Sequence, residues 1–165
     1  MIKTNAMRIL NKMNIVYDVI TYDVKDDKID GISVAKKICR DEKYVYKTLV
    51  THAASKDIYI IVIPVRKEID FKKVAKLTNE KRVEMLDLLD LQKYTGYIRG
   101  GCSPIGMKKL YKTFIDKSAL ETERIIVSAG KIGFQIEINA NLLKDIVDGE
   151  FADLIKWFLH YTKWS

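Results

Sequence analysis

Two apolar runs rich in β-branched and aromatic residues constrain the fold of this chain more than any other feature. The runs cover residues 45–52 and 58–65, and only the five residues 53–57 separate them. Runs of this length and composition are typical of β-strands. So short a connection is typical of a hairpin. The sequence therefore predicts that these two runs pair as antiparallel strands.

The rest of the chain mixes helices and strands without a regular βαβ alternation. Hydrophobic spacing predicts strands at 15–22, 113–115, 124–128 and 133–138, and helices at 6–13, 32–39, 71–77 and 139–147. Thr4 and Asp70 are the expected N-caps of two of these helices. Part of 83–94 is predicted to be helical, and the apolar residues of 151–158 also have helical spacing. This mixture predicts a single α+β domain over residues 1–165 around a largely antiparallel sheet.

A surplus of positive charge favours a polyanionic partner. Lysine and arginine number 29 against 22 aspartate and glutamate residues, which leaves a net charge of +7. Nucleic acid and anionic membranes attract such a surplus, although some proteins are basic only for solubility. Basic residues gather at 36–43, 72–82 and 108–112. They would follow a phosphate backbone if their faces met around one cleft, but each group alone could be an ordinary solvated face.

Neither a membrane segment nor a secretion signal is expected. The longest apolar stretch, 58–65, is far shorter than a membrane span, and residues 1–5 lack the apolar run of a signal peptide. The two cysteines and two histidines show no zinc-ligand spacing. The sequence therefore predicts a reduced, cytoplasmic protein without metal or cofactor. An aromatic tail, from about 154 to 165, is expected to dock on its own domain.

Lys47 is the first candidate for chemistry. In a strand it shares one face with Val45 and Leu49, while Tyr46 and Thr48 lie on the other. Because neither face is plainly solvated, this ammonium must be paired or used, for example as a fixed charge for a phosphate or a developing oxyanion. The alternative is an edge lysine that reaches water, and spacing alone favours that alternative.

Two glycine-containing segments are candidate binding loops. Residues 100–106 have the pattern G-x-x-x-P-x-G, which forces a tight loop that can present amide N–H groups to an anion or a carbonyl oxygen. Residues 128–133 predict a glycine turn between two strands. This turn would bind a ligand only if it lay beside the first loop. Both segments could also be plain connections, because neither matches a known nucleotide-binding pattern.

The sequence shows no conventional nucleophile with its base. Cys102 lies in the glycine loop and His52 could approach it, but a Cys–His hydrolase also needs an orienting group and a lowered thiol pKa. Ser103 and Ser128 lack an identifiable base. An enzyme of this sequence would therefore work mainly by positioning and electrostatic stabilisation.

Taken in order along the chain, these features resemble the YbaK family of aminoacyl-tRNA deacylases. Related editing domains are inserted in many bacterial prolyl-tRNA synthetases. The likeness covers roughly residues 3–155. The matching segments are 45–49, 70–75, 81–85, 95–97, 100–106 with Lys108 and Lys109, and 127–131.

The resemblance implies a mixed, mostly antiparallel and partly closed sheet flanked by helices. It also implies hydrolysis of the ester between a wrong amino acid and the 3′ end of tRNA, with Cys-tRNA(Pro) as the substrate of the YbaK subgroup. Prolyl-tRNA synthetase is a further expected partner. The resemblance places Lys47 at the active site as the catalytic residue. The substrate-binding residues that it implies are Tyr22, Thr48, Gly100, Gly101, Ser103, Pro104, Gly106, Ser128, Gly130 and Gln135.

Gln135 departs from the family pattern, which often has aspartate at this position. A neutral amide supplies no charge, so the choice of amino acid stays open. A module that binds tRNA or a synthetase without turnover is therefore the second hypothesis, and a small-molecule esterase is the third. If the protein is a deacylase, the attacking group would be a bound water, a ribose hydroxyl or the thiol of a cysteinyl substrate.

Overall fold

The computed structural model describes residues 2–157 of the chain, and within them the strands form two sheets. The smaller sheet has the order β1-β7-β6 and the larger one the order β4-β2-β3-β5-β8. The strands are β1 (Asp18–Thr21), β2 (Tyr46–Ala53), β3 (Ile58–Pro64), β4 (Val83–Met85), β5 (Lys112–Asp116), β6 (Arg124–Ser128), β7 (Phe134–Asn139) and β8 (Glu150–Ala152). An isolated parallel bridge between Val45 and Ile126 joins the two sheets.

Most strand pairs are antiparallel, as predicted. The expected hairpin is confirmed, because β2 and β3 pair from Tyr46 opposite Pro64 to His52 opposite Ile58. The pairs β1–β7, β6–β7 and β2–β4 are also antiparallel, whereas β3–β5 and β5–β8 are parallel. The larger sheet is therefore mixed, and the smaller one is purely antiparallel.

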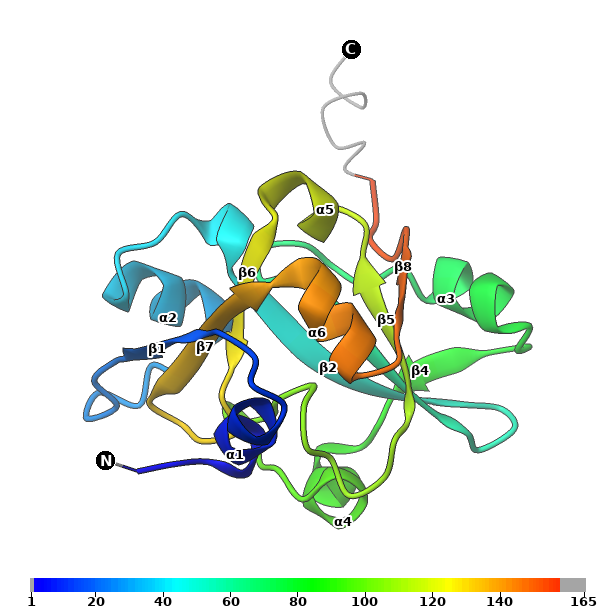
Figure 1. Ribbon diagram of the computed structural model, residues 1–165. Coiled ribbons are helices and arrows are strands. Elements are labelled where there is room, and N and C mark those ends of the chain that lie inside the picture. Colours follow the sequence, from blue (N-terminus) through cyan, green and yellow to red (C-terminus); the bar gives the residue numbers. More distant parts are fainter. Residues whose placement is uncertain (1, 158–165) are drawn as a thin grey trace.

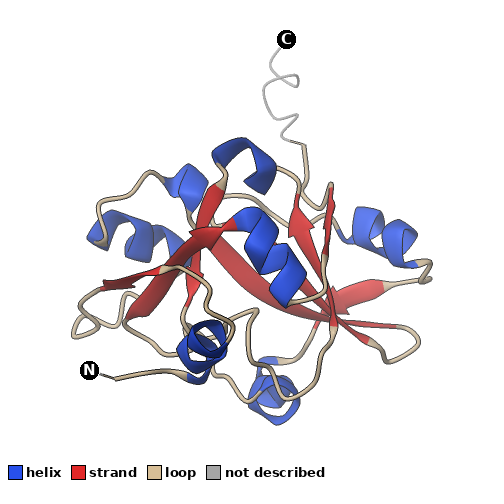
Figure 2. Cartoon of the chain, viewed as in Figure 1, coloured by secondary structure: helices blue, strands red, loops and turns tan. Residues whose placement is uncertain are grey.

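Helices flank both sheets (Figures 1 and 2). They are α1 (Asn5–Lys12), α2 (Gly31–Lys37), α3 (Phe71–Thr78), α4 (Leu91–Thr95), α5 (Ala119–Thr122) and α6 (Ala140–Ile146), with 3-10 turns η1 (Glu42–Tyr44) and η2 (Leu88–Asp90). In Figure 1, α6 crosses in front of the larger sheet, and α1 and α4 lie below it. On the left, α2 lies near β1 and β7, and α3 lies on the right near β4.

Side-chain caps begin the helices at the predicted places. The Thr4 hydroxyl accepts a hydrogen bond from Met7 N, and the Asp70 carboxylate accepts from the N–H groups of Lys72 and Lys73. Such caps satisfy amides that have no partner within the helix. Asp30 and Asn139 cap α2 and α6 in the same way.

One hydrophobic core lies between the two sheets. Tyr46 and Val50 of β2 enter it from the larger sheet, and Val127 and Ile136 enter from the smaller one, with α1 and α6 covering its sides. The opposite face of the larger sheet packs on α3 in a second cluster, through Ile61, Ile63, Phe114, Val74 and Leu154. Both faces of β3 are therefore buried, which explains why its sequence is a continuous apolar run rather than an alternating one.

One local prediction is wrong, and one is correct only in part. The first strand covers Asp18–Thr21, so the predicted range 15–22 is too long. Residues 83–94 are helical in part, as predicted, because η2 and most of α4 follow β4 there. Residues 151–157 form no helix. Glu150–Ala152 pair as β8 with β5, and Ile155 bridges Ile69. Pairing with the open edge of β5 outweighs the local helical spacing. The rest of the predicted aromatic tail, 158–165, lies outside the described residues. Its expected docking on the domain therefore stays a prediction.

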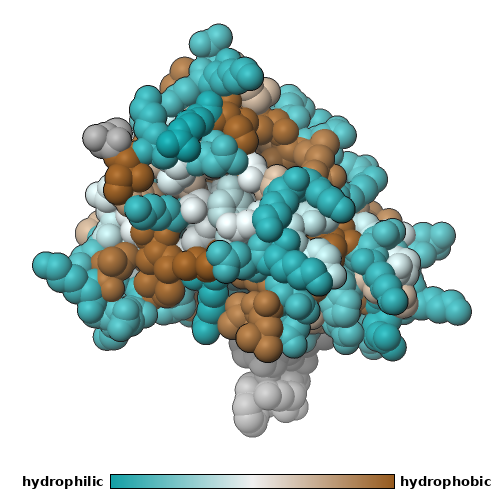
Figure 3. Space-filling view, turned by 90° about the horizontal axis from the view of Figure 1, so that it is seen from below, coloured by the Kyte–Doolittle hydropathy of each residue, from teal (hydrophilic) through white to brown (hydrophobic). Residues whose placement is uncertain are grey.

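No helix among residues 2–157 is long and apolar enough to cross a membrane. Figure 3 shows hydrophilic side chains over most of one face of the molecule, with the hydrophobic side chains in separate patches.

The cap of α3 can be tested directly. Asp70→Ala removes the acceptor of two helix amides, so the free energy of unfolding should fall by about 1 kcal/mol. Asp70→Asn keeps an oxygen in the same place and should cost clearly less. Urea denaturation of both variants measures the difference. If both variants lost the same free energy of unfolding, the charge of Asp70, rather than its capping hydrogen bonds, would stabilise this region.

Candidate active site

The candidate site begins at the outer edge of β2, which is only partly paired. β3 covers the inner edge of β2 along Tyr46–His52, whereas β4 covers the outer edge only at Thr51–Ala53. Val45 O accepts from Val65 N on the inner side, and Val50 O accepts from Leu86 N on the outer side. Backbone groups of an antiparallel strand alternate between its two edges. By this alternation, the amide and carbonyl of Thr48 face the unpaired part of the outer edge.

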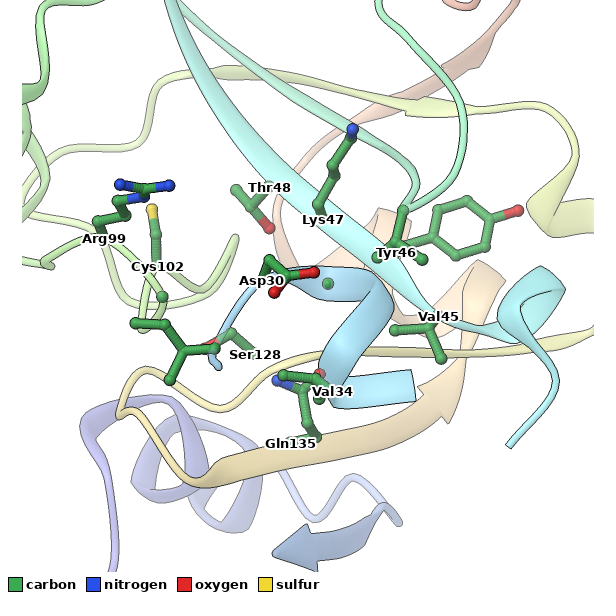
Figure 4. Close-up of a pocket in the computed structure, with 14 residues that line it drawn as sticks. Asp30, Val34, Val45, Tyr46, Lys47, Thr48, Arg99, Cys102, Ser128 and Gln135 are labelled. Atoms are coloured by element: carbon green, nitrogen blue, oxygen red, sulfur yellow. The ribbon is translucent and has the colours of Figure 1, made fainter. Parts of the chain in front are cut away.

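A pocket of about 190 Å³ lies at this edge, between the two sheets (Figure 4). β2 contributes Lys47 and Thr48 to its wall, and the adjacent ends of β6 and β7 contribute Ser128 and Gln135. Ser128 and Gln135 are opposite each other in the strand register. The start of α2, with Asp30 and Val34, and the loop through Arg99, Gly100 and Cys102 complete the wall. Pockets for drug-sized ligands have volumes of about 300–1,000 Å³, so this pocket suits a smaller group.

Lys47 carries a charge that has no ion pair among the described residues. The side chain is partly buried and lies on the face of β2 that includes Leu49, as predicted. Burial lowers the pKa of the Lys47 ammonium, and the Glu68 carboxylate offsets this in part. Within residues 2–157, Lys47 forms neither a hydrogen bond nor an ion pair through its side chain. Such an ammonium is suited to a bound anion.

Arg99 and Asp30 also line the pocket, and the sequence-based prediction missed both. Arg99 is exposed and has no ion pair among the described residues. Figure 4 shows Lys47 and Arg99 on one side of the pocket, Ser128 and Gln135 on the other, and Asp30 between them. Hydrogen bonds from the Ser33 hydroxyl and backbone N–H lower the pKa of the Asp30 carboxyl. The pocket therefore combines two cations with one ionised carboxylate.

The two glycine-containing segments lie against each other. A Cβ on Gly101 would be 3.1 Å from Ile132 N, and a Cβ on Gly130 would be 3.0 Å from the Tyr97 ring. Gly130 also has a φ of +96°, which disfavours any side chain. The turn at 128–133 therefore lies beside the 100–106 loop, as a binding role for this turn requires.

Two backbone amides of the glycine loop are free to bind a ligand. Gly101 N donates to Ile98 O, and Ile105 N donates to the Ser103 hydroxyl. In contrast, the amides of Gly100 and Cys102 have no acceptor within residues 2–157. Both residues lie in the pocket wall, so their N–H groups could stabilise a carbonyl oxygen or an anion.

Thr48 adds an unsatisfied hydroxyl to the same wall. Its Oγ1 is buried and has no hydrogen-bond partner among the described residues, and the same holds for the Tyr22 hydroxyl. A buried hydroxyl without a partner costs about 1–3 kcal/mol. A ligand that bonds to Thr48 would remove this cost. Tyr22 lies outside the pocket wall, with the Lys37 ammonium 5.8 Å from its ring centroid.

Other predicted residues support the site without lining it. Ser103 is fully buried and holds the loop through Ile105 N. Pro104 lines a separate surface hollow, together with Gly106. A Cβ on Gly106 would approach the Tyr97 hydroxyl to 2.9 Å. The pocket wall thus contains Lys47, Thr48, Gly100, Ser128 and Gln135 of the predicted set, but not Tyr22, Gly101, Ser103, Pro104, Gly106 or Gly130.

The Cys–His alternative fails, because the pKa of the thiol is not lowered and His52 does not share the pocket with Cys102. Burial raises the pKa of the Cys102 thiol to about 12, with a smaller opposing effect from the Thr95 hydroxyl. His52 lies at the other end of β2, with its Nε2 3.4 Å from Glu84. No cluster of three metal-binding side chains occurs within residues 2–157.

Thiol labelling tests the state of Cys102. With a pKa of about 12, fewer than about 1 in 10,000 Cys102 thiols are ionised at pH 7.5. Cys39→Ser, which leaves Cys102 as the remaining cysteine, should therefore react with iodoacetamide far more slowly than Cys102→Ser, which leaves the exposed Cys39. Equal labelling rates in the two variants would contradict this assignment.

Known proteins with editing functions resemble this chain in sequence and fold. The family model described as an aminoacyl-tRNA editing domain matches residues 28–146. EbsC of Enterococcus faecalis, provisionally named a Cys-tRNA(Pro)/Cys-tRNA(Cys) deacylase, is 42% identical over 152 residues, which cover 92% of this chain and 93% of EbsC. The proline–tRNA ligase of Lactobacillus helveticus is 28% identical over 105 residues, which cover 64% of this chain and 18% of the ligase.

A solved structure shares the fold. It is provisionally described as a trans-editing enzyme for prolyl-tRNA synthetase, and it superposes with a TM-score of 0.79 at 15% identity, covering 95% of this chain and 100% of that one. All residues in the pocket wall fall within the segment that the family model matches. The chain therefore belongs to the aminoacyl-tRNA editing domain family.

Proposed function

We propose that this protein is a deacylase that hydrolyses the ester of misacylated tRNA in trans, with Cys-tRNA(Pro) as its substrate. The observation that carries the proposal is a small pocket, with two unpaired cations and two free amides in its wall, in a chain of the editing family. The name of EbsC, 42% identical, supports cysteine as the amino acid. We further propose that residues 1–165 form a single editing domain that acts in the cytoplasm on tRNA released by prolyl-tRNA synthetase.

The size of the pocket matches the aminoacyl end of the substrate rather than a whole nucleotide. At about 190 Å³ it can hold a small amino acid and its ester group. Val34, Val45 and the neutral thiol of Cys102 supply an apolar part of its wall. The terminal adenosine and its phosphate would then remain at the entrance.

The charged and polar groups can be given separate roles. Lys47 and Arg99 would hold the phosphate of the terminal nucleotide, because cations contribute most of the affinity for nucleic acids. The free amides of Gly100 and Cys102 would bind the carbonyl oxygen as its negative charge develops. Thr48, Ser128 and Gln135 would contact the aminoacyl group through neutral hydrogen bonds.

The substrate supplies the attacking group in this proposal. Among the residues of the pocket wall, none is a histidine, and the thiol of Cys102 is protonated. A cysteinyl ester carries its own thiol close to its carbonyl carbon. As the new S–C bond forms, the C–O bond to the ribose breaks and the thiol proton passes to the ribose oxygen. The products of this step are free tRNA and a cysteine thiolactone, and water then opens the thiolactone to give cysteine, which completes the hydrolysis.

Lys47→Ala tests the role of the charge. Loss of an electrostatic contact to the reacting end of the substrate should lower kcat/KM for Cys-tRNA(Pro) by at least about 100-fold. Lys72→Ala removes an exposed lysine of α3 and serves as the matched control, with activity expected to stay unchanged. Circular dichroism should show the same fold for both. Full activity of Lys47→Ala would remove Lys47 from the mechanism.

A non-catalytic tRNA-binding module is the second candidate, because Gln135 is neutral and 6% exposed where a charged residue would otherwise orient the substrate. A deacylation panel of Cys-, Ala- and Ser-charged tRNA(Pro) separates the two functions. We expect turnover of Cys-tRNA(Pro) that is faster than turnover of the other two. Salt-sensitive binding without deacylation of any of them would instead identify a binding module.

A further inference from the structure

We propose that Asp30 binds the α-ammonium group of the aminoacyl ester and thereby orients the ester in the pocket. The inference rests on the proposed function, since it concerns the same pocket. It adds a positioning role for a residue that otherwise serves only as a helix cap.

The chemistry of the substrate requires such a partner. Every aminoacyl-tRNA except prolyl-tRNA carries a primary ammonium group on the carbon next to the ester carbonyl. Burying this charge without an anion is costly. Asp30 carries the one carboxylate among the residues that line the described pocket, and the amide of Gln135 on its far wall is neutral. The ammonium therefore has a single ionic partner available.

The surroundings of Asp30 leave its charge available. Its carboxylate accepts from the Ser33 hydroxyl through Oδ1 at 2.6 Å and from Ser33 N through Oδ2 at 3.1 Å. A carboxylate has about four acceptor positions, so both oxygens can accept another hydrogen bond. Asp30 forms no ion pair with a lysine or arginine among residues 2–157. The same two bonds from Ser33 lower the pKa of the Asp30 carboxyl further below its usual value, and the carboxyl is ionised at neutral pH.

The position of Asp30 matches the order of charges along the substrate. In Figure 4 its carboxylate lies between the cations Lys47 and Arg99 on one side and Gln135 on the other. A terminal phosphate at the two cations would place the ester near the free amides of Gly100 and Cys102, and the ammonium beyond it. An anion in the pocket wall between these groups complements that sequence of charges.

The capping role alone does not account for a charged residue here. Asn and Ser cap helices about as well as Asp. Asp30→Asn therefore separates the two roles, because it keeps an oxygen for Ser33 N and removes the negative charge. Asp41→Asn is the matched control. Asp41 also caps a short helical turn, η1, and lies outside the pocket wall.

The test compares two substrates that differ only in the ammonium group. One is Cys-tRNA(Pro) and the other is tRNA(Pro) acylated with 3-mercaptopropionate, which keeps the thiol and lacks the amine. The wild-type enzyme should favour the cysteinyl substrate in kcat/KM by about 10- to 100-fold, the effect of one charge-assisted hydrogen bond. Asp30→Asn should lose this preference by losing activity on the cysteinyl substrate alone. Asp41→Asn should keep it.

Two results would overturn the inference. Asp30→Asn could keep the preference of the wild type, or it could lose equal activity on both substrates, as a purely structural role requires. If the wild type turned over neither substrate, the proposed function would fail separately. The dissociation constants of the same two tRNAs would then test Asp30 alone, and equal affinities in the wild type would refute its role.

Discussion

The structure depends on the different pairing of the two edges of strand β2. Its inner edge pairs along almost its full length with β3, and this hairpin forms the centre of the larger sheet. Its outer edge pairs with β4 only near the C-terminal end, and at the other end it meets the smaller sheet through the Val45–Ile126 bridge. Between these contacts, no strand pairs with the outer edge of β2 at Thr48. The pocket lies at this interruption, where two sheets share a core without merging into one.

Unsatisfied polar groups gather at this junction. The Thr48 hydroxyl is buried without a partner, the Lys47 ammonium is partly buried without an ion pair, and two loop amides lack acceptors within the described residues. Each of these groups costs stability in the free protein. Their concentration around one small pocket is typical of a binding site, because a ligand of matching polarity satisfies several of them at once.

Local sequence patterns were sufficient to predict most of the elements. The β2–β3 hairpin, the helices capped by Thr4 and Asp70, and the α+β class are all confirmed. The failure at 151–157 has a clear cause. Phe151 and Ile155 have helical spacing, but β5 offers an open edge to which β8 adds in parallel. A partner that lies more than 30 residues away in the chain leaves no trace in local periodicity. Asp30 and Arg99 escaped prediction because a helix cap and an exposed arginine look ordinary in sequence.

The sequence by itself determined the local conformations: where strands and helices form, which residues cap them, and where glycine must turn the chain. These follow from propensity, spacing and short-range hydrogen bonds. The tertiary structure alone decided which of these elements meet. Lys47 and Gln135 line one pocket because the two sheets pack through a common core, and the loop at Gly100 reaches the turn at Gly130 only in the folded chain. Such contacts depend on the packing of distant surfaces, which no single segment of the sequence specifies.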